Sequence, residues 1–254
     1  MLIKGSLPLW EGCNYDDLVK KREELTEVPF NRGFRQIPYS SKDLMFPSFK
    51  NCIIENGVLP EINKMLIIVG GVDLSGKTRP GNVVFVLGVK PDGTRVPLAV
   101  KRGAWSSPET ARQIIGAYKD YETNIILVES VALQGMLIEW IDELPSGKRP
   151  SGMMIKGFCT GSQKSHPELG LPGLEGEFEK NKWEIYSPKH DFSCDCGWCV
   201  WIREMKSYPF AATTDCVMAC WFASEAIREW EHCKGRGNLG NIELSLKGEK
   251  RWDY

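Results

Sequence analysis

The sequence lacks any apolar run long enough to cross a bilayer. Its longest such runs, MLIIVGGV at 65–72 and VVFVLGV at 83–89, are far shorter than the ~20 residues that a spanning helix needs. The N-terminal stretch MLIKGSLPLW also lacks the hydrophobic region of a signal peptide. These absences argue against a membrane protein and predict a soluble, cytoplasmic chain.

An excess of charge of either sign is missing as well. Lys and Arg number 32 and Asp and Glu number 33, which leaves a net charge of −1, so a nucleic-acid surface would have to be a local patch. The composition, 42% hydrophobic and 26% charged, excludes disorder, collagen and coiled coil. The nine cysteines are an odd number in a chain long enough to bury a core, which argues against a disulfide scaffold.

Two common catalytic motifs are absent, namely the HExxH of zinc proteases and the Ser nucleophile elbow of hydrolases. The stretch 71–78, GVDLSGKT, does match the phosphate-binding P-loop pattern after an apolar strand. A P-loop requires a helix that begins at Gly-Lys-Thr, whereas here RPG and a second β-rich run follow. The sequence therefore disfavours a nucleotide site.

The chain divides into an N-terminal arm, 1–64, and a domain, 65–254. The arm alternates a charged helix-like stretch with proline-punctuated aromatic pieces, a pattern that packs on a domain without forming a core of its own. The domain opens with β-rich runs at 65–74, 82–89 and 95–103, whose short connections predict antiparallel neighbours.

Strands and helices then alternate, which is typical of parallel strands with helical crossovers. Helices are expected from Ser107, from Leu133 and over 213–233, and strands over 124–130 and 152–159. The predicted fold class is α/β: a mixed sheet of three antiparallel strands followed by parallel strands, with helices on both faces.

Three carboxylates occupy comparable places in this scheme. Asp73 ends the first strand, Glu129 ends the fourth, and Asp215 begins the last helix. A carboxylate at the end of an apolar strand is costly to bury unless a partner or a cation neutralises it. If the first and fourth strands are neighbours, the three acids meet and would bind Mg²⁺ or Mn²⁺, two ions of which promote phosphoryl displacement.

Each acid also has a purely structural interpretation. Asp73 would be a turn residue, Glu129 a salt-bridge partner at a strand end, and Asp215 a first-turn residue favoured by the helix dipole. The order of the three along the chain favours the metal site.

The arrangement resembles the RNase H-like nuclease fold. The strings GVDLSG, ILVESVALQGMLIEWI and TTDCVMACWFA resemble the nuclease domain of the large terminase subunit of tailed bacteriophages. The acids are separated by 129 − 73 = 56 and 215 − 129 = 86 residues, in agreement with that family's layout. The arm resembles the segment that joins the terminase ATPase to its nuclease.

This resemblance implies a viral endonuclease that cuts concatemeric double-stranded DNA during genome packaging, with two Mg²⁺ or Mn²⁺ ions held by Asp73, Glu129 and Asp215. The partners that it implies are the portal protein, the small terminase subunit and the ATPase portion of the large subunit. The location that it implies is the packaging motor at the procapsid portal, in the cytoplasm of the host cell. Where many relatives have a further acid after the first one, this chain has Lys77, Arg79 and Asn82. The ATPase is absent, so we expect an excised or separately encoded portion.

Four basic residues are candidates for DNA contacts: Lys101, Arg102, Lys156 and Lys164. Lys164 lies in GSQKSH, which is similar to a lysine-bearing loop of the terminase family. Solvated surface lysine is the alternative interpretation.

A second constellation, KHDFSCDCGWC, places His190, Cys194, Cys196 and Cys199 within ten residues. Four such ligands could form a structural Zn²⁺ site, and reduced cysteines in an irregular loop are the other open interpretation.

Two other function classes also remain open: another RNase H-like enzyme, such as a hybrid nuclease or junction resolvase, and a non-catalytic zinc-stapled docking module.

Overall fold

The computed structural model describes residues 15–24, 44–55, 57–74, 81–129, 152–166, 169–186 and 194–235. The helix expected from Leu133 and the side chains of Lys77, Arg79 and His190 lie outside these ranges. None of the helices described is long and apolar enough to cross a membrane.

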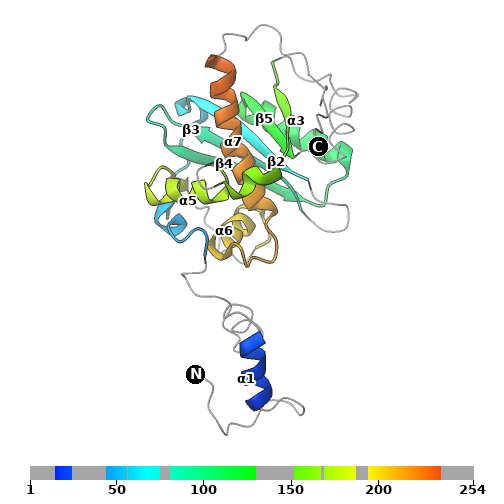
Figure 1. The fold of residues 1–254 in the computed structure, drawn as a ribbon. Helices are drawn as coiled ribbons and strands as arrows, with labels where there is room; N and C mark the ends of the chain where they lie inside the picture. The colour runs from blue at the N-terminus through cyan, green and yellow to red at the C-terminus, as the bar shows by residue number, and fades with distance from the viewer. Residues whose placement is uncertain are drawn as a thin grey trace, which may run out of the picture.

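A five-stranded mixed sheet with the order β4-β3-β2-β5-β6 forms the centre of the molecule (Figure 1). Its strands are β2 (Ile67–Asp73), β3 (Asn82–Val89), β4 (Arg95–Gly103), β5 (Ile125–Glu129) and β6 (Ile155–Phe158). β2, β3 and β4 pair antiparallel, whereas β5 is parallel to both β2 and β6. The predicted mixed sheet is confirmed.

The central strands carry apolar residues on both faces, which explains why helices pack against both faces of the sheet. All seven residues of β2 are buried, as expected of a central strand in an α/β protein. Alternate residues contribute to two separate cores, with Val69 in one and Val72 in the other.

One face of the sheet packs against α3 (Ser107–Tyr121), whose buried side chains include Ala111 and Ile114. The predicted helix is confirmed, but its N-cap is Ser106, one residue before the expected Ser107. The second face packs against α7, α6 and α5. Their bounds are α5 (Leu171–Glu179), α6 (Gly197–Ser207) and α7 (Asp215–Gly235).

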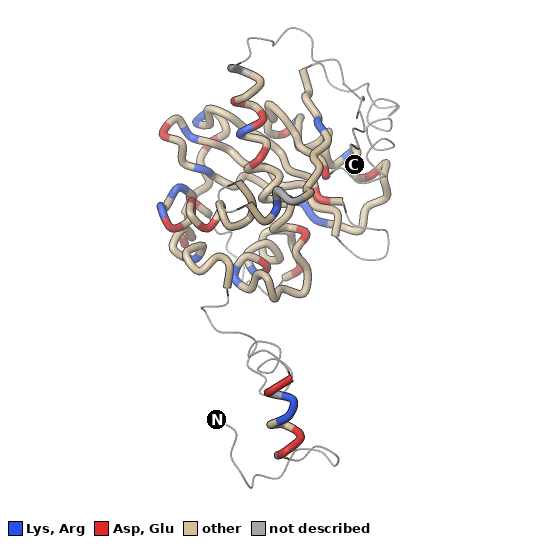
Figure 2. The backbone as a smooth tube through the Cα atoms, in the orientation of Figure 1, with Lys and Arg blue, Asp and Glu red and all other residues tan. Residues whose placement is uncertain are grey.

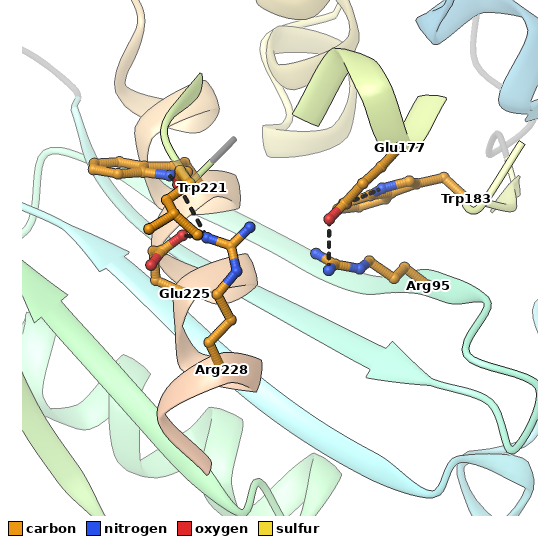
Figure 3. A network of polar contacts seen from close by, with 7 residues as sticks. Arg95, Glu177, Trp183, Trp221, Glu225 and Arg228 are labelled. Atoms are coloured by element: carbon orange, nitrogen blue, oxygen red, sulfur yellow. Dashed lines mark hydrogen bonds and ion pairs between the residues drawn. The ribbon is translucent and has the colours of Figure 1, made fainter. Parts of the chain in front are cut away.

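α7 lies directly on the centre of the sheet, where Figure 1 shows it crossing β2. The close approach depends on Gly71, since a Cβ atom there would lie 2.1 Å from the carbonyl oxygen of Ala219. A polar network holds the middle of α7 (Figure 3): Trp221 and Arg228 both donate to the carbonyl oxygen of Leu169, and Arg228 pairs with Glu225. Nearby, Arg95 of β4 forms a partly buried ion pair with Glu177 of α5 at 2.6 Å.

The end of the predicted arm is part of this second core. Phe46, Phe49 and Cys52 are buried there, and β1 (Ile53–Ile54) pairs in parallel with β7 (Ile185–Tyr186). The boundary at residue 64 stays a prediction, but the folded unit includes residues from 46 to 54.

Four further elements complete the described chain: α1 (Tyr15–Glu24) and the 3-10 helices η2 (Phe49–Cys52), η3 (Ile62–Lys64) and η4 (Gly161–Ser165), of which η4 follows β6.

Candidate functional site

The site is built at the carboxyl ends of the two central parallel strands. β2 and β5 are paired up to Val72 and Val128, so the next residues, Asp73 and Glu129, lie side by side. Crevices at the carboxyl ends of parallel strands are where open α/β sheets bind ligands. The predicted proximity of these two acids is therefore present in the structure.

Asp215 reaches the two acids from the helical layer that covers the sheet. It is the first residue of α7, and α7 packs on β2 and β5. Asp73 interacts electrostatically with both Glu129 and Asp215, and it shares a hydrogen bond with the side chain of Glu129. Residues separated by 56 and 86 positions in the sequence are thus brought to one place.

The electrostatics of this acid cluster are unfavourable for three carboxylates that carry their full charges. Asp73 and Asp215 are each only 7% exposed, and Glu129 is partly buried. Burial, followed by the hydrogen bond and the charge of Glu129 and by the charges of Asp215 and Glu204, raises the pKa of Asp73 to about 9.

The donor set suits hard divalent cations, which prefer carboxylate oxygens. Within the described ranges, the only group of three His, Cys, Asp or Glu residues with ligand atoms all within 4.8 Å is the cysteine cluster. The ligand oxygens of Asp73, Glu129 and Asp215 therefore do not all lie within that distance of one another.

Glu204 is a fourth acid that sequence reasoning missed. It lies on α6, is 2% exposed, and contributes to the raised pKa of Asp73. Its carboxylate accepts hydrogen bonds from the backbone N–H groups of Cys216 and Val217 at 2.8 and 3.1 Å, and from the Thr213 hydroxyl at 2.5 Å. Glu204 therefore caps the start of α7 and holds Asp215 in position.

A sequence signal for Glu204 does exist. In a helix, Trp201, Glu204 and Met205 share one face, and an acid on an otherwise apolar face needs buried donors. The cysteine-rich string before it obscures this helix, which begins at Gly197.

The four basic candidates are distributed over both faces of the sheet. Arg102 pairs with Val83, and Val83 pairs with Asp73, so Arg102 lies on the same face as Asp73, two strands or about 10 Å away. Lys164 lies in η4, after the end of β6 at which Phe158 pairs with Glu129.

The other two basic residues are engaged elsewhere. Lys101 forms an ion pair with Asp120 of α3 at 3.2 Å, on the opposite face of the sheet. Lys156 contacts Glu229 of α7 at 2.5 Å. Side chains alternate along β4, so Lys101 lies on the face of the sheet away from Asp73, where its predicted DNA contact finds no support from the acid cluster. The DNA contact predicted for Lys156 stays a prediction.

The cysteine cluster at the start of α6 is the second candidate site. Cys194 Sγ lies 3.2 Å from the sulfurs of both Cys196 and Cys199. These three residues could hold a metal ion. His190 lies outside the described residues, so its predicted part in the site stays a prediction.

The P-loop pattern spans the connection between two antiparallel strands. β2 ends at Asp73 and β3 begins at Asn82, only four residues after Thr78. Residues 75–80, which include the Gly-Lys-Thr of the pattern, lie outside the described ranges, so the argument against a nucleotide site stays a prediction from the sequence.

No protein-family model matches the chain, and no curated protein matches it. Among solved structures, the large terminase nuclease from the thermophilic phage G20c, with bound zinc, has a TM-score of 0.50 at 12% identity. The match covers 71% of this chain and 97% of that one.

Two Holliday junction resolvases also match, but their TM-scores are too low to support a conclusion about this chain. The yeast mitochondrial Holliday junction resolvase has a TM-score of 0.37 at 11% identity, over 78% of this chain and 92% of that one. RuvC from T. thermophilus, in complex with a Holliday junction substrate, has 0.35 at 11% identity, over 66% and 97%. At these identities the likeness concerns the fold, and the chain has the RNase H-like fold that it shares with the G20c large terminase nuclease.

Proposed function

We propose that the chain is a divalent-metal-dependent endonuclease that cleaves double-stranded DNA, as a terminase nuclease does during viral genome packaging. The observation that supports this proposal is the meeting of Asp73, Glu129 and Asp215 at the carboxyl ends of β2 and β5. The fold shared with the G20c large terminase nuclease adds support.

Asp73, Glu129 and Asp215 would hold two Mg²⁺ or Mn²⁺ ions. When bound, such a pair stabilises the attacking and leaving oxygens of a phosphodiester displacement. Glu204 keeps Asp215 at the site by capping α7. Arg102 and Lys164 are placed at the same end of the sheet and would contact DNA phosphates.

The portal, small-subunit and ATPase partners, and a location at the packaging motor, belong to the same proposal. Their support is the sequence resemblance alone.

Cleavage of supercoiled plasmid in Mn²⁺ or Mg²⁺ tests the activity. We expect nicked and linear products with the wild type, and none in chelator or with Asp73→Asn, Glu129→Gln or Asp215→Asn. Asp92→Asn is the matched control, because Asp92 lies in the exposed turn between β3 and β4, away from the acid cluster. Its carboxylate accepts a hydrogen bond from the Thr94 N–H at 2.9 Å, which the amide oxygen of Asn preserves.

Substrate choice separates the alternatives. Preferred cleavage of a four-way junction or an RNA–DNA hybrid over linear duplex would replace the terminase-type assignment with another RNase H-like activity. An absence of metal-dependent cleavage on all three substrates would favour a non-catalytic docking module.

A further inference from the structure

Three cysteines form a compact cluster where α6 begins. Cys196 is the N-cap of α6, Cys199 lies in its first turn, and Cys194 precedes Cys196 by two residues. None of the three forms a disulfide, and their sulfur atoms lie within 4.8 Å of one another. The cluster plays no part in the proposed acid site.

The sulfur distances agree with a shared metal better than with a disulfide. Cys194 Sγ is 3.2 Å from each of the other two sulfurs, much longer than the ~2.05 Å of a disulfide bond. Zn–S bonds of about 2.3 Å in a tetrahedral site place the sulfurs about 3.8 Å apart. A shift of roughly half an ångström would therefore admit a zinc ion.

The backbone around the cluster is held independently of any metal. A Cβ atom on Gly197 would lie 2.1 Å from the carbonyl oxygen of Val100, so α6 begins directly against β4. Arg203, two turns along α6, donates to the carbonyl oxygen of Cys194 at 2.8 Å and pairs with Asp195 at 3.2 Å. Residues 194–197 are thus held by contacts with β4 and with α6 itself, which lowers the entropic cost of binding a ligand there.

We propose that Cys194, Cys196 and Cys199 bind one structural Zn²⁺ ion that fastens the start of α6. Thiolates select soft or borderline cations such as zinc. Structural zinc sites accept three cysteines together with one nitrogen ligand, whereas iron–sulfur clusters in their common forms require four cysteines, so three cysteines favour zinc.

The site has a consequence for the acid cluster. α6 carries Glu204, which caps α7 next to Asp215. Zinc at the start of α6 therefore stabilises the frame that positions Asp215. The zinc proposal itself does not depend on the proposed nuclease function.

Zinc content of the full chain, purified without added metal, tests the proposal. We expect about one zinc ion per chain in the wild type and nearly none in Cys196→Ser. Cys159→Ser is the matched control, because Cys159 is an exposed cysteine outside the cluster, and this variant should keep its zinc. Asp73→Asn should also keep it, which separates this site from the carboxylates.

A second measurement on the wild type covers the case that Cys196→Ser does not fold. Removing zinc with a chelator should make three further thiols reactive and lower the melting temperature, and adding zinc back should restore both. Replacement of zinc by cobalt should give a thiolate-to-metal absorption band. The proposal would be overturned if the purified wild type contained no zinc and its melting temperature did not change when zinc was added. A disulfide within the cluster would overturn it as well.

Discussion

Asp73 is a buried carboxyl that faces three other carboxyl groups, and this conflict makes its protonation sensitive to the folded state. Its pKa of about 9 lies far above the ordinary 3.8, so the folded metal-free chain holds a proton that the unfolded chain releases. The contribution of Asp73 to stability is full below pH ~4 and is lost progressively as the pH rises towards 9.

Asp73→Asn should therefore raise the stability of the metal-free protein at pH 8 and leave it nearly unchanged at pH 4. The amide is neutral at both values, so the variant avoids the cost of keeping the carboxyl protonated. Thermal melts in chelator measure this, and each kcal/mol corresponds to about 2–4 °C for a domain of this size. An equal gain at both pH values would show that the acid cluster is not its cause.

Glu204 is expected to act through Asp215 without itself reacting. Glu204→Ala leaves the buried N–H groups of Cys216 and Val217 without their acceptor, at a cost on the order of 1–3 kcal/mol. Because the variant displaces Asp215, we expect kcat for DNA cleavage to fall more than KM changes. Glu204→Gln keeps an acceptor oxygen and should recover much of both losses. A kcat equal to that of the wild type in Glu204→Ala would show that Glu204 does not position Asp215.

At the level of elements, the contact between β2 and α7 decides where Asp73 and Asp215 lie relative to each other. The helix reaches the strand because Gly71 has no side chain, and a Cβ atom there would lie 2.1 Å from Ala219 O and 2.3 Å from Ala223 N. Both atoms belong to the backbone of α7, so the helix itself would have to move.

Gly71→Ala should destabilise the fold by at least ~1–3 kcal/mol through overpacking and should reduce cleavage. Gly176→Ala is the matched control, since a Cβ atom on this helical glycine of α5 would have no neighbour within 4 Å, and alanine there should stabilise by ~0.4–1 kcal/mol. Denaturant melts of the two variants give the comparison. A Gly71→Ala variant as stable as the wild type would contradict the close packing of α7 on β2.

The strands of the sheet and the helices α3 and α7 could be predicted because their sequence signals are local. The apolar runs that form β2, β3 and β5 are bounded by turn residues, and α3 begins with Ser-Ser-Pro. The acids Asp73 and Glu129 could be predicted to meet because each ends a parallel strand.

The remaining features depend on tertiary contacts that no local pattern reports. β1 and β7 are two residues each and pair across more than a hundred positions, and Phe49 is buried against Phe178 of α5 and Trp201 of α6. α5 could not be predicted because its nine residues include Gly173 and Gly176, and glycine disfavours helices in isolation.

For the molecule as a whole, acidic and basic residues are interspersed along the chain (Figure 2), in keeping with a net charge of −1. DNA binding would then depend on a few local contacts, and its salt dependence counts them.

Lys164→Ala should weaken DNA binding and reduce the slope of log K against log salt by about one. Lys101→Ala is the control, because Lys101 is paired with Asp120 on the far face of the sheet and its loss should leave the slope unchanged. Fluorescence anisotropy with duplex DNA over a salt series, in chelator, measures both. Equal slopes for wild type and Lys164→Ala would exclude this lysine from the DNA surface.

Three acids from β2, β5 and α7 are proposed to hold divalent cations together, and everything else in the proposed activity depends on this arrangement. Anomalous scattering from crystals of the full chain soaked in Mn²⁺ tests it most directly. We predict two Mn²⁺ peaks ~3.5–4 Å apart, bonded by Asp73, Glu129 and Asp215, and their loss in Asp73→Asn. Manganese bound only elsewhere, with none at these three carboxylates, would contradict the proposed metal site.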